Sequence, residues 1–134
     1  MEDGADPAAD FAAKRAWIES LVEEFPDLIP IYQGHIGFYD DLLAHLLFGD
    51  VVQWIEDLYA AGEYGTIKAF VDRIERDYPT LGPGARNVID VSFAEDLPRP
   101  GTRGGEIALW LGPNLRREYV RGHHLQEWLD LRHD

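Results

Sequence analysis

Cysteine is absent from the 134 residues, and this absence excludes disulfide frameworks, thiolate nucleophiles and cysteine-based zinc sites. Apolar runs of the roughly 18 residues that cross a bilayer are also absent, so we expect no transmembrane helix. The first ten residues are acidic and lack the apolar stretch of a secretory signal. We therefore expect a cytoplasmic protein.

Basic residues are scarce. Twelve Lys and Arg face 25 Asp and Glu, which gives a formal net charge of -13. Binding to phosphates or anionic lipids needs cationic contacts, so the sequence predicts neither a nucleic-acid partner nor a membrane partner. Apolar residues make up 46% of the chain and aromatic residues 12%, which is enough for a hydrophobic core in one domain.

The negative charge is concentrated in the first half of the chain. Residues 1–65 hold 14 acidic residues and only two basic ones, whereas residues 66–134 hold 11 and 10. Lys and Arg are missing altogether between Arg15 and Lys68. Two interpretations stay open at this point. The charge can be a solubilising surface, or it can be a docking face whose field attracts a basic partner.

Apolar residues recur at three- and four-residue spacing along most of the chain, which predicts helices and no strand. The expected helices are 11–25, 38–47, 51–61, 66–78, 83–97, 106–111, 114–121 and 124–132. Pro26–Gly37 is expected to be an irregular loop, Gly49-Asp50 to separate two helices, and Pro98–Gly105 to be a flexible loop. Asn87–Phe93 has strand-forming residues, but its neighbours keep helical spacing and favour a helix.

These elements predict an all-α fold of about eight short helices, packed as antiparallel α-hairpins that can stack like a short solenoid. Residues 1–10 are expected to be a disordered amino terminus, and residues 11–134 a single helical domain.

No catalytic motif is found, and no catalytic, cofactor or metal residue is predicted. Ser20 and Ser92 lie outside any nucleophile motif and fit helix interiors. His35 and His45 lack metal-ligand spacing, and the adjacent pair His123-His124 would diverge on a helix. Glu95 borders an apolar stripe in the last turn of its helix, where the helix dipole disfavours a negative charge. We therefore expect Glu95 to have a cationic partner, either Arg99 or Arg103.

Three motifs carry a family resemblance. They are Gly49-Asp50-Val51-Val52-Gln53-Trp54, Val91-Ser92-Phe93-Ala94-Glu95-Asp96-Leu97 and Leu111-Gly112-Pro113-Asn114-Leu115. Over about residues 38–120 the chain resembles a group of small all-helical bacterial proteins that are similar to immunity proteins of polymorphic toxin systems. The resemblance implies a helical fold and a toxin partner. It implies no catalytic residues, because the motif residues are structural.

The sequence-based hypothesis is a cytoplasmic binding protein, an immunity protein that occludes a cognate toxin with a basic surface. Its acidic side chains would mimic a phosphate array, and aromatic side chains would supply hot spots. The predicted partner-binding residues are Asp40, Asp41, Asp50, Glu56, Asp57, Glu63, Tyr59 and Tyr64. The alternatives are an enzyme that uses Asp, Glu or His without a recognisable motif, and a structural adaptor.

Overall fold

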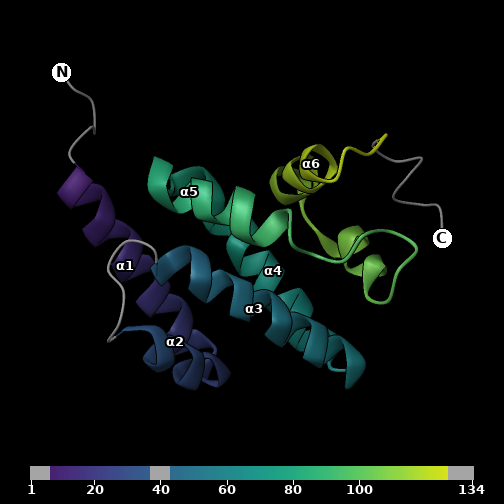
Figure 1. The fold of residues 1–134 in the computed structure, drawn as a ribbon, viewed down its shortest axis with the longest axis horizontal. Helices are drawn as coiled ribbons and strands as arrows, with labels where there is room; N and C mark the ends of the chain where they lie inside the picture. Colours follow the sequence, from purple (N-terminus) through teal and green to yellow (C-terminus); the bar gives the residue numbers. More distant parts are fainter. Residues whose placement is uncertain (1–6, 37–42, 127–134) are drawn as a thin grey trace.

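Helical spacing of apolar residues determines the architecture. The computed structural model describes residues 7–36 and 43–126, and within these ranges it contains helices and turns but no strand (Figure 1). The α-helices are α1 (Pro7–Glu24), α2 (Ile29–Ile36), α3 (Leu43–Ala60), α4 (Tyr64–Asp77), α5 (Pro83–Ile89) and α6 (Pro113–Gly122). Shorter elements are the 3₁₀ turns η1 (Pro26–Leu28), η2 (Tyr78–Thr80) and η4 (Gly105–Trp110), and the π-helical turn η3 (Asp90–Ala94). The all-α prediction is confirmed.

Helix α3 crosses the middle of the molecule (Figure 1). It packs against α2, α4, α5 and η3, and its inward residues Phe48, Val51 and Ile55 are buried. Helices α3 and α4 form a hairpin through a short turn at Gly62, which has a φ of 79°. A solenoid stacks consecutive elements only. Here α1 packs against α5, so the elements gather around α3 instead of forming a sequential stack.

The predicted break at Gly49-Asp50 is wrong. Both residues lie inside α3, on its exposed side, while Phe48 and Val51 on either side are buried. Glycine inside a helix costs about 1 kcal/mol relative to alanine. The continuous apolar stripe buried along α3 outweighs that cost. Of the predicted helix 38–47, residues 38–42 lie outside the described part of the chain.

The loop predicted at Pro26–Gly37 is also wrong as far as the structure describes it, because η1 and α2 fill residues 26–36. Pro26 opens η1 and Pro30 is the second residue of α2. Backbone N–H groups in the first turn have no partner within the helix, so proline fits there. Leu28 is buried and anchors this segment to the core.

At the amino terminus, α1 begins at Pro7, four residues before the predicted start, so residues 7–10 are helical. Ala8 and Ala9 favour helix, and the carboxylate of Asp10 accepts a hydrogen bond from the Gly84 N–H, 3.3 Å away, at the start of α5. Residues 1–6 lie outside the described ranges. At the other end, His124–Gln126 are not helical, and residues 127–134 of the predicted last helix are not described.

The helical prediction for Asn87–Phe93 is confirmed, with a π-helical turn over Asp90–Ala94. Both serines have structural contacts. The Ser92 hydroxyl lies 2.6 Å from Nδ1 of His45 and links η3 to α3, and the Ser20 hydroxyl donates to the Trp17 carbonyl at 2.6 Å. The predicted ion pair of Glu95 with Arg99 or Arg103 is not found in the described residues. Arg99 instead donates to the His123 carbonyl at 3.2 Å.

Pro98–Gly105 follows an irregular path, as predicted, but internal contacts hold it in place. The Tyr119 hydroxyl donates to the Pro98 carbonyl, and the Gly105 N–H donates to the Thr102 carbonyl at 2.8 Å. Gly105 is buried, and a side chain there would collide with the Arg99 carbonyl. These contacts anchor both ends of the loop, and its flexibility stays a prediction.

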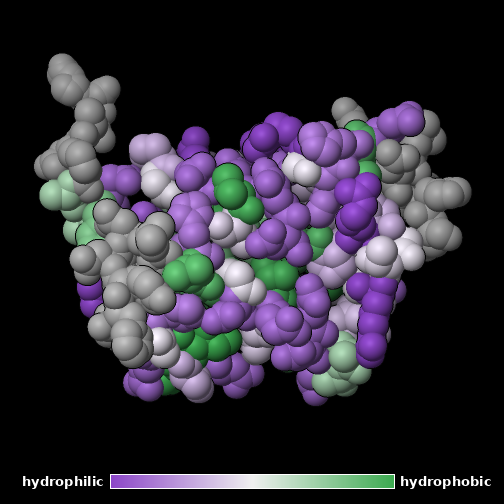
Figure 2. Space-filling view, viewed as in Figure 1, coloured by the Kyte–Doolittle hydropathy of each residue, from purple (hydrophilic) through white to green (hydrophobic). Residues whose placement is uncertain are grey.

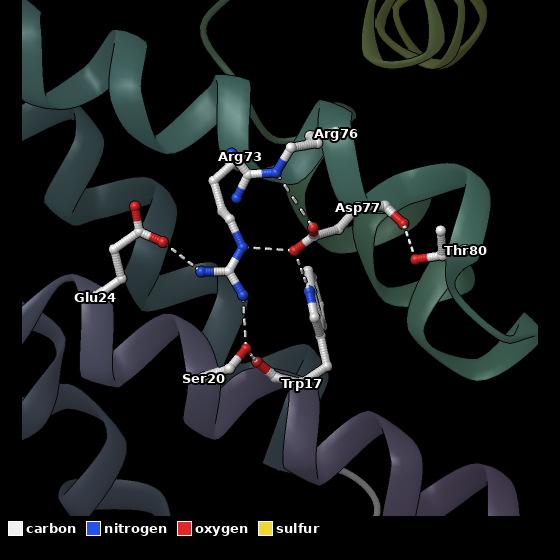
Figure 3. Close-up of polar contacts among 7 residues, drawn as sticks. All are labelled: Trp17, Ser20, Glu24, Arg73, Arg76, Asp77 and Thr80. Atoms are coloured by element: carbon white, nitrogen blue, oxygen red, sulfur yellow. Dashed lines mark hydrogen bonds and ion pairs between the residues drawn. The ribbon is translucent and has the colours of Figure 1, made fainter.

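Two polar residues of α4, Arg73 and Glu75, make long-range contacts. Arg73 links α4 to α1: its guanidinium donates to Asp77 at 2.6 Å, to Ser20 at 2.7 Å and to Glu24 (Figure 3). The carboxylate of Glu75 accepts hydrogen bonds from the Asn114 N–H at 3.0 Å and the Leu115 N–H at 2.9 Å, which caps α6. Among the described helices, none is both long and apolar enough to cross a membrane.

Candidate functional site

The outward side of α3 and the turn after it carry four exposed carboxylates, which we call the acidic face: Asp50, Glu56, Asp57 and Glu63. Within the described residues, none of them pairs with a lysine or arginine. Nε2 of His35, on α2, lies 2.7 Å from Oδ2 of Asp50, and the Gln53 amide donates to Asp57 at 3.1 Å. The acidic face therefore projects a largely uncompensated negative field.

Two further residues predicted for this site, Asp40 and Asp41, lie outside the described ranges. The other six lie on α3, on α4 or in the turn between them, so the structure brings them to one region of the molecule.

The two predicted tyrosines are joined by an aromatic residue that the sequence did not indicate. Tyr59 at the end of α3, Tyr64 at the start of α4 and Trp110 in η4 form what we call the aromatic cluster. Its ring centroids are 5.2, 5.4 and 6.4 Å apart. Tyr64 is 39% exposed, and Nζ of Lys68 lies 4.9 Å from the Trp110 ring centroid. The cluster thus presents aromatic surface beside the acidic face and already holds one cation.

Tyr59 is fixed in orientation by a hydrogen bond from its hydroxyl to Glu106, at 2.9 Å. This bond to a carboxylate is the main reason why the pKa of Tyr59 rises to about 12. The phenol therefore stays neutral at any physiological pH and acts as a hydrogen-bond donor rather than a base.

Two grooves flank the acidic face. The first, which we call the Tyr59 groove, lies between α3 and the 98–105 loop. Glu56, Asp57 and Tyr59 line one wall, and Arg103 lines the other. It therefore presents both signs of charge. Gln53, Ala60 and Gly104 complete its lining.

The second groove, which we call the Trp54 groove, lies where η1 meets α3 and α4. Its aromatic lining comes from Trp54 and Phe25, and its carboxylates are Glu24 and Asp27. Pro26, Gly65, Thr66 and Ala69 complete it. The lining contains no cationic residue among the described side chains. Trp54 packs edgewise against Phe25 at 6.2 Å and Phe70 at 5.3 Å, so its ring is held rigidly at the surface.

Sequence reasoning missed Trp54, Trp110, Lys68 and Glu106. Trp54 stands at the edge of the apolar stripe of α3, a position typical of a half-exposed side chain. Trp110 and Glu106 gave no signal, because only the path of the 98–105 loop brings η4 to the end of α3 (Figure 1). No three His, Asp or Glu side chains converge as a metal site in the described ranges.

Apolar exposure elsewhere is scattered. Leu46, Val91, Ile29 and Leu109 are each between 40% and 45% exposed. Figure 2 shows hydrophilic residues over most of one face, with apolar residues in separate patches. The acidic face with its aromatic neighbours is therefore the best-defined candidate site.

Comparison with known proteins places the chain in a family. The search of curated proteins and the search of solved structures gave no match. A family model described as "Domain of unknown function (DUF7674)" matches residues 18–128, which include α3, α4, η4 and both grooves. Because the match covers most of its length, the chain belongs to the DUF7674 family.

Proposed function

We propose that this chain is a binding protein rather than an enzyme, and that it neutralises a basic protein by covering it. The specific proposal is an immunity protein that occludes the cationic substrate groove of a cognate toxin, acting in the cytoplasm. The family resemblance of the three motifs supports the toxin partner, and the structure of the acidic face supports the mechanism.

The observation that carries the proposal is the combination of carboxylates without a lysine or arginine partner along α3 and its turn with aromatic rings at the α3–α4 turn. Asp50, Glu56, Asp57 and Glu63 lack a lysine or arginine partner within the described residues, although ten basic residues follow residue 65. Like charges left unpaired on one face weaken the folded state slightly. Their cost is offset when a basic partner binds.

The aromatic cluster supplies the buried contact area that gives an interface its affinity, which exposed charges alone do not provide. Interface hot spots are enriched in tyrosine, tryptophan and arginine, whereas exposed charges mainly affect the association rate. Tyr59 follows Glu56 by three residues, Tyr64 directly follows Glu63, and the two tyrosines flank the same turn. Partner binding would therefore combine steering by the acidic face with burial of the aromatic rings.

The experiment is charge reversal on α3, with the product of the adjacent gene as the partner. The double variant Glu56→Lys/Asp57→Lys should weaken binding at least a hundredfold, because it replaces attraction by repulsion at the interface centre. Surface plasmon resonance at increasing salt should show the wild-type association rate falling steeply, since exposed charges are screened over about 10 Å at 0.1 M salt.

Asp72→Lys/Asp96→Lys is the matched control, because it changes net charge equally at two exposed positions outside the acidic face. It should reduce the association rate only modestly. If both double variants bind alike, or if the rate is independent of salt, the electrostatic mechanism is wrong. A partner that is itself acidic would also contradict it.

A further inference from the structure

The Trp54 groove shares no lining residue with the aromatic cluster, and its lining combines three features. Trp54 offers a large, rigid ring, Asp27 and Glu24 offer negative charge, and the small residues Gly65 and Ala69 leave space along α4. Asp27 is exposed and makes no ion pair within the described residues. Glu24 is bound by Arg73 through one of its oxygens, which keeps that carboxylate fixed at the rim.

We propose that the Trp54 groove is a docking pocket for an arginine side chain of the partner protein, a second contact point beside the acidic face. This inference rests on the proposed function and names the chemistry of one contact. An arginine has an apolar stem that can lie along Gly65 and Ala69, and a planar guanidinium that can stack on tryptophan and pair with a carboxylate.

Charge complementarity selects this groove over the Tyr59 groove. Arg103 lines the Tyr59 groove together with Glu56 and Asp57, so a guanidinium that enters it meets a like charge as well as the two carboxylates. The charged residues in the described lining of the Trp54 groove are Glu24 and Asp27. Arg73, which pairs with Glu24, is not part of that lining, and Asp27 makes no ion pair within the described residues. Electrostatic attraction and the aromatic surface therefore favour the same cationic side chain in the Trp54 groove.

The geometry also explains why arginine is preferred to lysine. Trp54 packs edgewise against Phe25 and Phe70, so its ring needs no reordering when a flat group stacks on it. An ammonium group cannot stack in this way and remains strongly hydrated. The pocket therefore discriminates between two side chains of equal charge.

The test uses the full chain and two capped peptides, hexa-arginine and hexa-lysine, with binding measured by isothermal titration calorimetry. Wild-type protein should bind hexa-arginine more tightly. Ala69→Leu fills the groove from its α4 wall without touching the core, since Ala69 is exposed. It should weaken hexa-arginine binding about fivefold, the effect of losing one partly desolvated cation–π contact, and change hexa-lysine binding little.

The matched control is Ala60→Leu, which fills the Tyr59 groove at an exposed position of α3. It should leave the arginine preference unchanged. If Ala69→Leu behaves like wild type, if Ala60→Leu removes the preference instead, or if wild-type protein binds neither peptide, the inference is overturned.

Titration of the native partner separates this inference from the proposed function. Ala69→Leu and Glu56→Lys/Asp57→Lys should both weaken partner binding. If only the charge reversal does so, the acidic face binds the partner and the Trp54 pocket does not. If neither variant changes partner binding, the proposed function and the inference are both wrong.

Discussion

Carboxylates serve different purposes on α3 and on the helices that follow it. On α4, Asp77 is bound by Arg73 and by the Trp17 indole, and Glu75 caps α6. On α6, Glu118 is nearly buried between Arg117 and Arg121. The acidic face of α3 and its turn has no lysine or arginine partner in the described residues, where its one ion pair joins Asp50 to His35. The same residue types therefore contact arginine or cap a helix in one region and lie exposed without a lysine or arginine partner in the other.

This contrast explains the uneven charge of the sequence. In residues 66–134 acidic and basic residues are nearly equal in number, and several of them form ion pairs with one another. Most of the acidic residues before residue 66 have no lysine or arginine partner in the described residues. Glu24 is an exception, because it reaches Arg73 from α1. Substitutions in the two regions should differ in their effect on stability and on binding.

The largest loss of stability is expected for Arg73→Met. Arg73 has only 13% of its side chain exposed, and its removal leaves Asp77, 20% exposed, without its main partner. We expect unfolding free energy to fall by about 3 kcal/mol in urea denaturation, near the low end for a broken buried ion pair. The control Arg76→Met, at a position 69% exposed, should change it by less than about 0.5 kcal/mol.

The loss caused by Arg73→Met should also depend on pH. Burial raises the pKa of Asp77, but hydrogen bonds from Arg73 and Trp17 outweigh burial and leave the pKa below its ordinary value of 3.8. A lowered pKa in the folded state stabilises the protein above the ordinary value, and the gain disappears as pH falls through the folded pKa. Wild type and variant should converge in acid, and a constant difference would contradict this account.

A smaller effect is expected for Glu75→Ala, which removes the cap of α6 supplied from α4. The N–H groups of Asn114 and Leu115 lose their acceptor, so we expect a loss of about 1.5 kcal/mol. Hydrogen exchange at these two amides should accelerate. Asp72→Ala, also on α4 but exposed, should alter neither property. Unchanged exchange in Glu75→Ala would show that another acceptor replaces the cap.

Helix content could be predicted from the sequence because it depends on local spacing. The inward residues Ile67, Phe70, Val71 and Ile74 of α4 are all buried, as their spacing predicts. Glycine and proline misled the prediction. Gly49 is part of α3, because the burial of its apolar neighbours outweighs the cost of a glycine inside a helix. Pro30 is part of α2, because proline fits in the first turn of a helix. Local rules cannot weigh burial that is created by distant helices.

The candidate site was predictable only in part. Four of the predicted residues form the acidic face, and Tyr59 and Tyr64 belong to the aromatic cluster beside it. The acids could be predicted because a stretch without lysine or arginine is visible in the sequence. The roles of Arg73, Glu75 and Trp110 were not visible, since each depends on contacts with residues at least 39 positions away. Arg73 and Glu75 look like ordinary surface residues of an amphipathic helix until α1 and α6 are placed beside them.

Asp90→Asn should increase stability at neutral pH. This variant tests whether a carboxylate in the second half of the chain can also destabilise the fold when it is partly buried without a lysine or arginine partner among the described residues. Burial is the main reason why the pKa of Asp90 lies above its ordinary value of 3.8, and nearby Glu118 adds to this rise. A raised pKa stabilises the fold only at low pH, and the benefit is lost as pH rises through the folded pKa. An asparagine can still accept the Tyr78 hydrogen bond, which is 2.9 Å long in wild type.

We therefore expect Asp90→Asn to gain up to about 1 kcal/mol at pH 7 and to lose this advantage below pH 4. Thermal denaturation at both pH values measures the difference. Asp72→Asn, at an exposed position of α4, should change stability little at either pH. A destabilised Asp90→Asn at pH 7 would mean that the ionised carboxylate contributes to the fold.

The smallest effect is expected on the acidic face itself, where Glu56→Gln/Asp57→Asn removes two charges and keeps side-chain size. Both residues are exposed, and neither has a lysine or arginine partner in the described residues, so unfolding free energy should change by less than about 0.5 kcal/mol. The sign should be stabilising at low salt, because two members of a like-charged group are removed. Adding salt should stabilise wild type more than the variant, since salt screens the repulsion that the variant lacks. Denaturant titrations at low and high salt measure this difference. A loss above 1 kcal/mol would show that Glu56 and Asp57 stabilise the fold as the acids of α4 and α6 do, and the contrast between the two regions would then be wrong.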